Sequence, residues 1–277
     1  MTVISRTSLI ALPTFMLSGL AYLQFGPPYR IEIPSLPKIK LNLTAPRAPI
    51  QLTPVYSIPP EHAQKSIAIT VDAEGGSSQD MARLLKSLKV RKSKATFFIC
   101  GNWAPYNYPN IKKMVADGHE IGNHTLTHKF GPKLSDNDLK LELIYLETAI
   151  NKHTGLTTKP LFRPPYGATS PKGRQIIKDL GYKNILWNVD IRDALKPYPS
   201  YETMLARLIK VHPGSIVLMH SVRKETLNAL IAALPYYKEK GIKLVTVSEL
   251  IEIGDAGHKK ALAKKKVKMQ NKKPKAK

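Results

Sequence analysis

The sequence is poor in cysteine and in acidic residues, and each shortage narrows what the protein can be. Its 277 residues include one cysteine, Cys100, so no disulfide can form within the chain. Because Cys100 ends the apolar run 95–100, we expect a buried thiol rather than a reactive one. Only 20 acidic residues accompany 43 basic ones, and the net charge of +23 indicates contact with a polyanion, whether nucleic acid, anionic lipid or an anionic wall polymer.

The chain also lacks an internal repeat and any recognisable nucleic-acid-reading motif, which argues against a nucleic-acid-binding protein. Residues 7–25 carry no charge and follow Arg6, as in a secretory signal peptide or an uncleaved membrane anchor, with a buried N-terminal helix as the alternative. Residues 26–60 hold nine of the 22 prolines, which predicts an extended spacer or an arm packed along the domain. Residues 259–277 hold ten lysines and no acid, either as a contact for an anionic polymer or membrane or as a solubilising tail.

These shifts in composition divide the chain into four parts. We expect a signal peptide or anchor (1–25), a Pro-rich linker (26–64), a globular catalytic domain (65–255) and a Lys-rich tail (256–277). The first part predicts export to the cell envelope, in the periplasm or at the cell surface, with residues 7–25 as a membrane anchor if they are not cleaved.

Within the globular part, short apolar runs alternate with helical patterns. We expect strands over 66–71, 95–100, 184–189, 215–219 and 242–245, and helices over 81–88, 111–116, 135–152, 172–180, 201–211 and 225–240. Repeated alternation of buried strands and helices predicts an α/β fold with a parallel sheet, open or closed into a barrel.

Residues whose side chains could catalyse a reaction or bind a metal lie where these strands end. His124 and His128 are four residues apart, and on a helical turn they would share a face and could bind one divalent metal, unless they are two solvated surface histidines. The complete set of groups is Asp72 with Glu74, His124 with His128, Arg163-Pro-Pro-Tyr-Gly167, Asp190 with Asp193, and Leu218-Met-His220. Each group alone has an ordinary explanation, such as a helix cap, a rigid turn or a core histidine. Their shared position indicates one site, because the loops after parallel strands converge on one face of a barrel.

With these motifs, residues 65–253 closely resemble the polysaccharide deacetylase family, also called the NodB-homology domain or carbohydrate esterase family 4. The segment His124–His128 resembles the family's metal-binding motif, residues 162–167 its third motif and residues 216–221 its last. The resemblance implies a distorted (β/α) barrel with about seven parallel strands. It also implies a hydrolase that removes acetyl groups from N-acetylated glycans, or occasionally from O-acetylated xylan.

The resemblance assigns roles that agree with the needs of amide hydrolysis: an activated water, a stabiliser of the oxyanion and an acid for the leaving amine. Asp72 is expected to be the general base, with Arg163 holding it ionised and in place. The backbone N–H of Tyr166 is expected to bind the oxyanion, in a loop stiffened by two prolines.

The remaining roles fall on the later motifs. His220 is expected to protonate the sugar amine, and Asp193 to orient its imidazole and raise its pKa. Leu218, Trp187 and Tyr166 are expected to contact the substrate, with core packing as the alternative for Trp187.

Two positions depart from the family pattern. Ala73 stands where the family has a metal-binding aspartate, and it cannot bind a metal. Residues i and i+2 of a strand face the same side, so we expect Glu74 to join His124 and His128 as the third ligand. The expected metal is Zn²⁺, and Co²⁺ or Ni²⁺ would suit similar ligands. The second departure is Ala194, where a tryptophan commonly follows the aspartate, so one wall of the pocket is open.

The expected substrate is an N-acetylglucosamine polymer, and we expect peptidoglycan in particular, since an exported enzyme would meet it. Chitin-type oligosaccharides, poly-N-acetylglucosamine and acetylxylan remain open. A non-catalytic glycan-binding pseudoenzyme of the same fold is the main alternative, with Ala73 and Ala194 as signs of lost activity.

Overall fold

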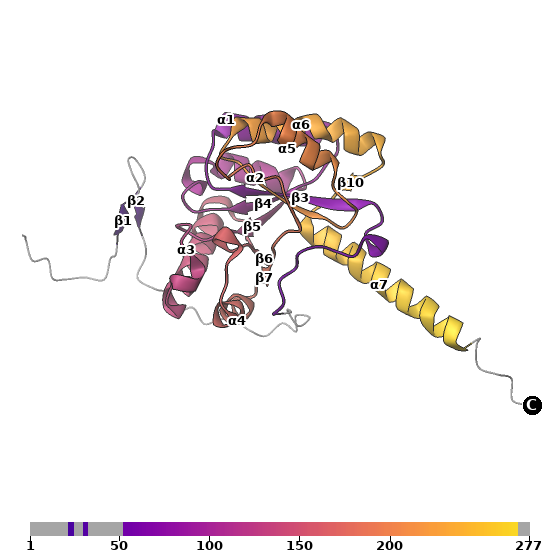
Figure 1. The fold of residues 1–277 in the computed structure, drawn as a ribbon. Helices are drawn as coiled ribbons and strands as arrows, with labels where there is room; N and C mark the ends of the chain where they lie inside the picture. The colour runs from indigo at the N-terminus through magenta and orange to yellow at the C-terminus, as the bar shows by residue number, and fades with distance from the viewer. Residues whose placement is uncertain (1–21, 25–29, 33–51, 271–277) are drawn as a thin grey trace, which may run out of the picture. The chain divides into compact units, whose positions relative to one another are not determined.

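The computed structural model describes residues 22–24, 30–32 and 52–270 (Figure 1). Residues 1–45 form a unit of their own, in which β1 (Tyr22–Gln24) pairs antiparallel with β2 (Arg30–Glu32). The rest of the expected signal peptide or anchor, residues 1–21 and 25, lies outside the described residues. Among the helices that are described, none is long and apolar enough to cross a bilayer.

The second unit is built on one parallel sheet with the strand order β7-β6-β5-β4-β3-β9-β8, and β10 pairs with the start of β3. This curled sheet with outer helices confirms the expected (β/α) barrel of about seven strands. The strands are β3 (Ser66–Ala73), β4 (Thr96–Ile99), β5 (Glu120–Asn123), β6 (Leu161–Phe162), β7 (Lys183–Asn184), β8 (Val189–Asp190), β9 (Ile216–His220) and β10 (Lys243–Leu244). The single strand expected over 184–189 is wrong: it is two short strands, β7 and β8, which pair with different neighbours.

The helices pack against one another in the order α5, α6, α1, α2, α3, α4 around the sheet (Figure 1). Four of them begin after a serine whose hydroxyl accepts the N–H three residues later, which satisfies one of the free donors of the first turn. The helices are α1 (Ser78–Val90), α2 (Tyr108–Ala116), α3 (Asp136–Thr154), α4 (Pro171–Asp179), α5 (Tyr201–Ile209), α6 (Lys224–Glu239) and α7 (Val247–Gln270).

Part of the expected linker belongs to the folded domain. Val55 bridges to Ile185, just after β7, and Ser57 bridges to Ser215, just before β9. The backbone N–H of Val55 donates to Asn184, and the N–H of Ile58 donates to Gly214, both at 2.9 Å. This segment therefore pairs with the chain just after β7 and just before β9, in the gap between the two sides of the sheet.

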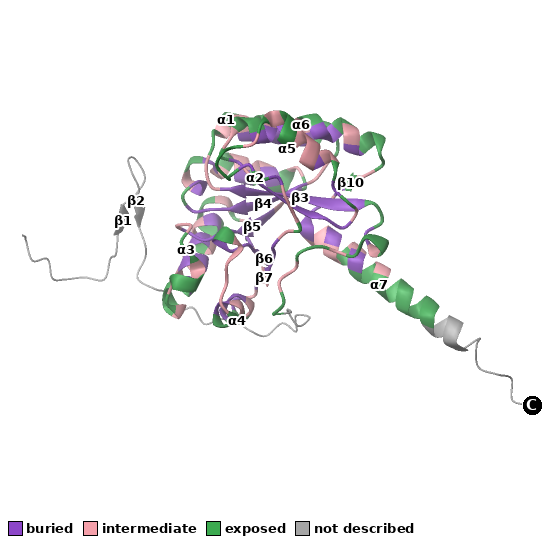
Figure 2. Cartoon of the chain, viewed as in Figure 1, coloured by how far each residue is buried: buried purple, intermediate pink, exposed green. Residues whose placement is uncertain are grey.

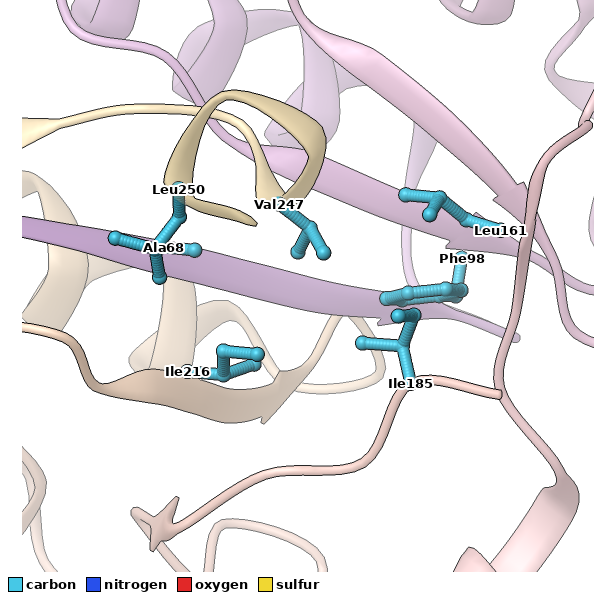
Figure 3. Close-up of a cluster of buried hydrophobic side chains, with 7 residues drawn as sticks. All are labelled: Ala68, Phe98, Leu161, Ile185, Ile216, Val247 and Leu250. Atoms are coloured by element: carbon cyan, nitrogen blue, oxygen red, sulfur yellow. The ribbon is translucent and has the colours of Figure 1, made fainter. Parts of the chain in front are cut away.

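The first turn of α7 closes the bottom of the barrel. Val247 and Leu250 are buried against Ala68, Phe98 and Ile216, which come from three different strands (Figure 3). Glu120 at the start of β5 accepts the N–H and hydroxyl of Ser248 and so fixes this end of the helix. Farther along, α7 is exposed (Figure 2), and it continues to residue 270 through most of the Lys-rich segment that begins at 256.

Candidate metal centre and active site

The end of β3 places two carboxylates beside one histidine. Asp72 is the penultimate residue of β3, and Glu74 is the first residue after the strand. Oδ2 of Asp72 lies 3.5 Å from Nε2 of His124, and Oε2 of Glu74 lies 4.0 Å from the same nitrogen. Ala73, between them, is buried in the strand. The alternation of a β-strand therefore brings Asp72 and Glu74 to one side, and this sets the location of the site.

The two histidines lie on a loop after β5, and the expected helical turn is wrong. Thr125 has φ of 66° and His128 has φ of 59°, both in the left-handed region, which a helix does not allow. The Thr125 hydroxyl accepts the N–H of His128 at 3.1 Å and closes this loop. The ring centroids of His124 and His128 are nevertheless 5.0 Å apart. The loop therefore brings the two rings together, as a helical turn was expected to do.

Glu74, His124 and His128 offer ligand atoms that all lie within 4.8 Å of one another. Nε2 of His128 is 2.6 Å from Oε2 of Glu74. Nδ1 of His124 is 2.8 Å from the Arg163 carbonyl, which can only accept, so Nδ1 carries the proton and Nε2 is left with a lone pair. Burial lowers the pKa of His124 despite the nearby acids, which favours the neutral ring. Two imidazoles and a carboxylate with open positions fit a divalent metal such as zinc.

Asp72 forms an ion pair with Arg163 inside the protein. Nη1 of Arg163 donates to Oδ1 of Asp72 at 2.7 Å, and Arg163 is 0% exposed. The carbonyls of Ile185 and Leu186 accept two further guanidinium N–H groups, and the Phe98 ring lies 4.2 Å below the guanidinium carbon. Burial raises the pKa of Asp72, but the charge of Arg163, followed by those of the histidines, lowers it below its usual value. Asp72 is therefore ionised, and its Oδ2 faces the metal centre.

Tyr166 lies in a strained turn beside the histidines. Its φ of 59° is unusual for a residue with a side chain, and it follows Pro164 and Pro165, which restrict the backbone. The Tyr166 ring lies 5.0 Å from the His128 ring and is 68% exposed. Within the described part of the chain, the Tyr166 N–H donates no hydrogen bond to a backbone carbonyl or a side chain. That N–H is therefore available to an oxyanion.

His220 ends β9, opposite Asp72 in the register between β3 and β9. Asp193 holds it with both carboxylate oxygens: Oδ1 lies 2.8 Å from Nδ1, and Oδ2 accepts the backbone N–H at 2.8 Å. Burial lowers the pKa of His220, but its hydrogen bond to Asp193 and the charges of Asp72, Asp193 and Glu74 raise it to about 9. Asp190, the other acid of this motif, accepts the N–H of Arg192 instead and shapes the loop.

The residues expected to line the acetyl pocket differ in how deeply they are buried and in what they contact. Leu218 is buried in β9, next to Thr70 of β3 and Asp190 of β8 in register. Trp187 is half-buried, lies 5.5 Å from the Arg163 guanidinium carbon and packs where a side chain on Gly167 would collide. Ala194 is exposed beside the buried Asp193.

Two residues near the site, Glu142 and Phe130, are not among those predicted from the sequence. Glu142 of α3 accepts the N–H and the hydroxyl of Thr127, and so anchors the histidine loop. Its signal was present, because Glu142 stands between Leu139 and Leu146 on the apolar face of the helix. Phe130 is exposed, and its ring centroid lies 6.0 Å from that of Tyr166, which extends the aromatic wall beside His128.

Comparison with known proteins agrees with this geometry. Residues 60–185 match the family model described as polysaccharide deacetylase. A peptidoglycan-N-acetylglucosamine deacetylase of Bacillus cereus is 34% identical over 194 residues, which cover 68% of this chain and 89% of that protein. YlxY of Bacillus subtilis, an uncharacterized protein, is 32% identical over 206 residues and covers 73% of this chain. The chain spans only 62% of the length of YlxY.

Among solved structures, BA3943 of Bacillus anthracis, described as a CE4 family pseudoenzyme, matches with a TM-score of 0.65 and 31% identity over 73% of this chain and 69% of that one. A mutant of BA3943 described as having restored enzymatic activity matches with a TM-score of 0.66 and 33% identity, over 73% of this chain and 72% of that one. The fold and most of the domain length are therefore shared with both active and inactive proteins.

Proposed function

The chain belongs to the polysaccharide deacetylase family, and on that premise we propose that it removes acetyl groups from N-acetylglucosamine residues of peptidoglycan. One observation carries the proposal. A buried, ionised Asp72 and a protonated His220 lie on neighbouring strands, beside the set of Glu74, His124 and His128. A base and an acid on either side of a metal centre are what amide hydrolysis needs.

Glu74, His124 and His128 would hold the metal, and we propose zinc, with cobalt or nickel suited to the same ligands. When bound, the metal supplies a Lewis acid that polarises the acetyl carbonyl and lowers the pKa of water. Asp72 then accepts the proton of the attacking water on Oδ2, because Oδ1 is occupied by Arg163. Its lowered pKa keeps it ready as an acceptor at neutral pH.

The later steps use the opposite side of the site. The N–H of Tyr166 donates to the oxyanion as the carbonyl carbon becomes tetrahedral. His220, with a pKa near 9, carries a proton at neutral pH and gives it to the departing amine. Asp193 keeps the ring in place on Nδ1, so that Nε2 faces the substrate. Leu218 and Trp187 would enclose the acetyl methyl group.

A non-catalytic glycan-binding function is the second candidate, and it has a specific observation in its favour. Ala73 removes a metal-binding aspartate that the family usually has, and a structural neighbour is a pseudoenzyme. The placement of Glu74 against both histidines argues for activity, since it restores a carboxylate to the centre.

Acetate release decides between the two candidates. The purified protein would be treated with chelator, loaded with zinc, and given peptidoglycan, chitin oligosaccharides and acetylxylan. We expect zinc-dependent acetate release that is greatest with peptidoglycan and falls at least about 100-fold in Asp72→Asn. If no metal gives acetate while glycan binding persists, the protein is a binding module.

The proposed location is the cell envelope, because the N-terminal residues 7–25 have the composition of a signal or anchor. A fusion of residues 1–64 to a reporter that is active only outside the cytoplasm tests this. Signal from the fusion, and none when residues 7–25 are deleted, supports export. A silent fusion that is present at normal levels contradicts it.

A further inference from the structure

A basic cavity of about 670 Å³ opens at the end of the domain away from the candidate active site. Its walls are the turn after α1, the end of α6 with β10, and the first turns of α7. Lys243 of β10 pairs with Ser66, the first residue of β3, whereas Asp72 lies near the last. At about 3.3 Å per residue, Ser66 and Asp72 are roughly 20 Å apart along the strand. A ligand in this cavity therefore leaves the catalytic face free.

The walls of the cavity carry more positive than negative charge. They contribute five cations and two carboxylates: Arg91, Lys92, Lys94, Lys238 and Lys243, with Glu249 and Glu252. Lys94 pairs with Glu249 at 2.5 Å. Within residues 52–265, the other four cations form no ion pair. The C-terminal ends of α1 and α6 also face this region, and each adds about half a negative charge, so a surplus of positive charge remains.

The positive charge continues beyond the cavity along one face of α7. Glu249 and Ile253 line the cavity, and residues 256, 260 and 264 follow at spacings of three or four, which keeps them on the same helical face. Two of these three are Lys260 and Lys264, both exposed. From Ile253 to Lys264 the helix rises about 16 Å. The cations of the cavity and those of the helix thus form one elongated track.

We propose that this track, consisting of Arg91, Lys92, Lys238, Lys243, Lys260 and Lys264, binds a linear phosphate-bearing polymer. Lysine and arginine at separate points along a line match phosphates spaced along a flexible chain. A concave wall admits such a chain but not the plane of a bilayer, and this distinguishes the track from a membrane-binding surface. The polymer would bind at the end of the domain opposite the catalytic face, which would leave that face free to contact the glycan. The track rests on its own residues and is separate from the deacetylase activity.

Binding of linear polyphosphate to the full chain tests the proposal, with orthophosphate and phosphatidylglycerol vesicles as parallel ligands. The cavity variant carries Lys92→Gln, Lys238→Gln and Lys243→Gln, and the helix variant carries Lys260→Gln and Lys264→Gln. The matched control carries Lys112→Gln, Lys140→Gln and Lys152→Gln, which removes the same charge as the cavity variant from exposed lysines of α2 and α3.

We expect polyphosphate affinity to fall at least about tenfold in the cavity variant and severalfold in the helix variant, with less than about a twofold change in the control. The dependence of log affinity on log salt should become shallower by roughly 0.7 for each lost contact. An equal loss in the control would overturn the proposal, because it would show attraction to net charge alone. Orthophosphate binding as tightly as the polymer, or vesicle binding with the same dependence on the cavity lysines, would also overturn it. Acetate release from a small soluble substrate should stay at the wild-type level in all three variants, which keeps this test apart from that of the deacetylase.

Discussion

Arg163 and Asp72 form a buried ion pair in which Nη1 of the guanidinium lies 2.7 Å from Oδ1 of the carboxylate. Breaking such a pair leaves a charge without a partner in a place that water does not reach, which costs about 3–5 kcal/mol. The pair links strand β3 to the segment after β6, so it serves both the stability of the barrel and the charge state of the proposed base.

We expect Arg163→Met to lower the free energy of unfolding by about 3–5 kcal/mol near pH 7. The lowered pKa of Asp72 contributes stability above its usual value of 3.8, and this contribution is lost as the pH falls through the folded value. In the variant, burial raises that pKa instead, so the deficit should shrink as the medium becomes acidic. Urea unfolding from pH 4 to 7.5 measures this, with Arg163→Lys as a partial rescue. A deficit that is independent of pH would contradict the charge argument.

Asp193→Asn should lower the pKa of His220 from about 9 toward its ordinary 6.5, because the variant removes the carboxylate that stabilises the protonated ring. The stabilisation from the raised pKa is complete below about 6.5 and is lost as the pH rises through 9. NMR titration of the His220 ring in metal-free protein reports it directly. Asp190→Asn is the matched control, since Asp190 bonds to the backbone of Arg192. An unchanged His220 titration in Asp193→Asn would remove Asp193 from its assigned role.

Apolar patterns in the sequence predict the buried strands correctly, but they do not predict the segments where the backbone leaves regular structure. The strand that carries Asp72 and the alternation with Glu74 follow from a run of apolar residues. The loop of His124 and His128 did not, because Thr125 and His128 adopt positive φ values and the loop is anchored through Thr127 by Glu142, from a helix later in the chain. The apolar face of α3 marks Glu142 as buried, but no local pattern shows that its partner is Thr127.

The pairing of residues 55–58 with the sheet also depends on contacts between distant residues, which the sequence does not reveal. Proline content marked residues 26–60 as extended chain, and that pattern describes a spacer and an arm equally well. The two are told apart by the gap in the sheet between β7 and β9, where the backbone of residues 55–58 lies. A gap in a barrel is a property of the whole sheet, so no window of the sequence reveals it.

Val55→Pro should destabilise the protein by about 1–2 kcal/mol more than Val55→Ala does. Proline has no N–H to donate to Asn184, whereas alanine keeps this hydrogen bond and loses only side-chain packing. Thermal and urea unfolding of both variants gives the difference. Equal stabilities of Val55→Pro and Val55→Ala would mean that residues 55–58 cover the gap without a stabilising hydrogen bond to the sheet.

His119 should make the protein sensitive to mild acid. Its Nδ1 accepts the N–H of Ala95 at 3.2 Å, which requires the neutral ring, and burial lowers its pKa to about 4. A lowered pKa gives stability that is complete above about 6.5 and lost as the pH falls toward 4, up to about 3 kcal/mol.

His119→Asn keeps an acceptor near the position of Nδ1 and cannot be protonated. We expect it to lose less stability than the wild type between pH 6.5 and 4.5, while His212→Asn, at an exposed position, follows the wild type. Parallel slopes for His119→Asn and the wild type would show that another group controls the acid transition.

The central claim is that Glu74 provides the carboxylate that Ala73 cannot provide. Zinc titration of the metal-free protein by calorimetry, with Glu74→Gln and with Glu61→Gln as an exposed control, tests it most directly. The account predicts one zinc per wild-type chain, a fall in affinity of at least about tenfold in Glu74→Gln, and no change in Glu61→Gln. Wild-type zinc affinity in Glu74→Gln would contradict it, and would leave His124 and His128 without a carboxylate partner from this position.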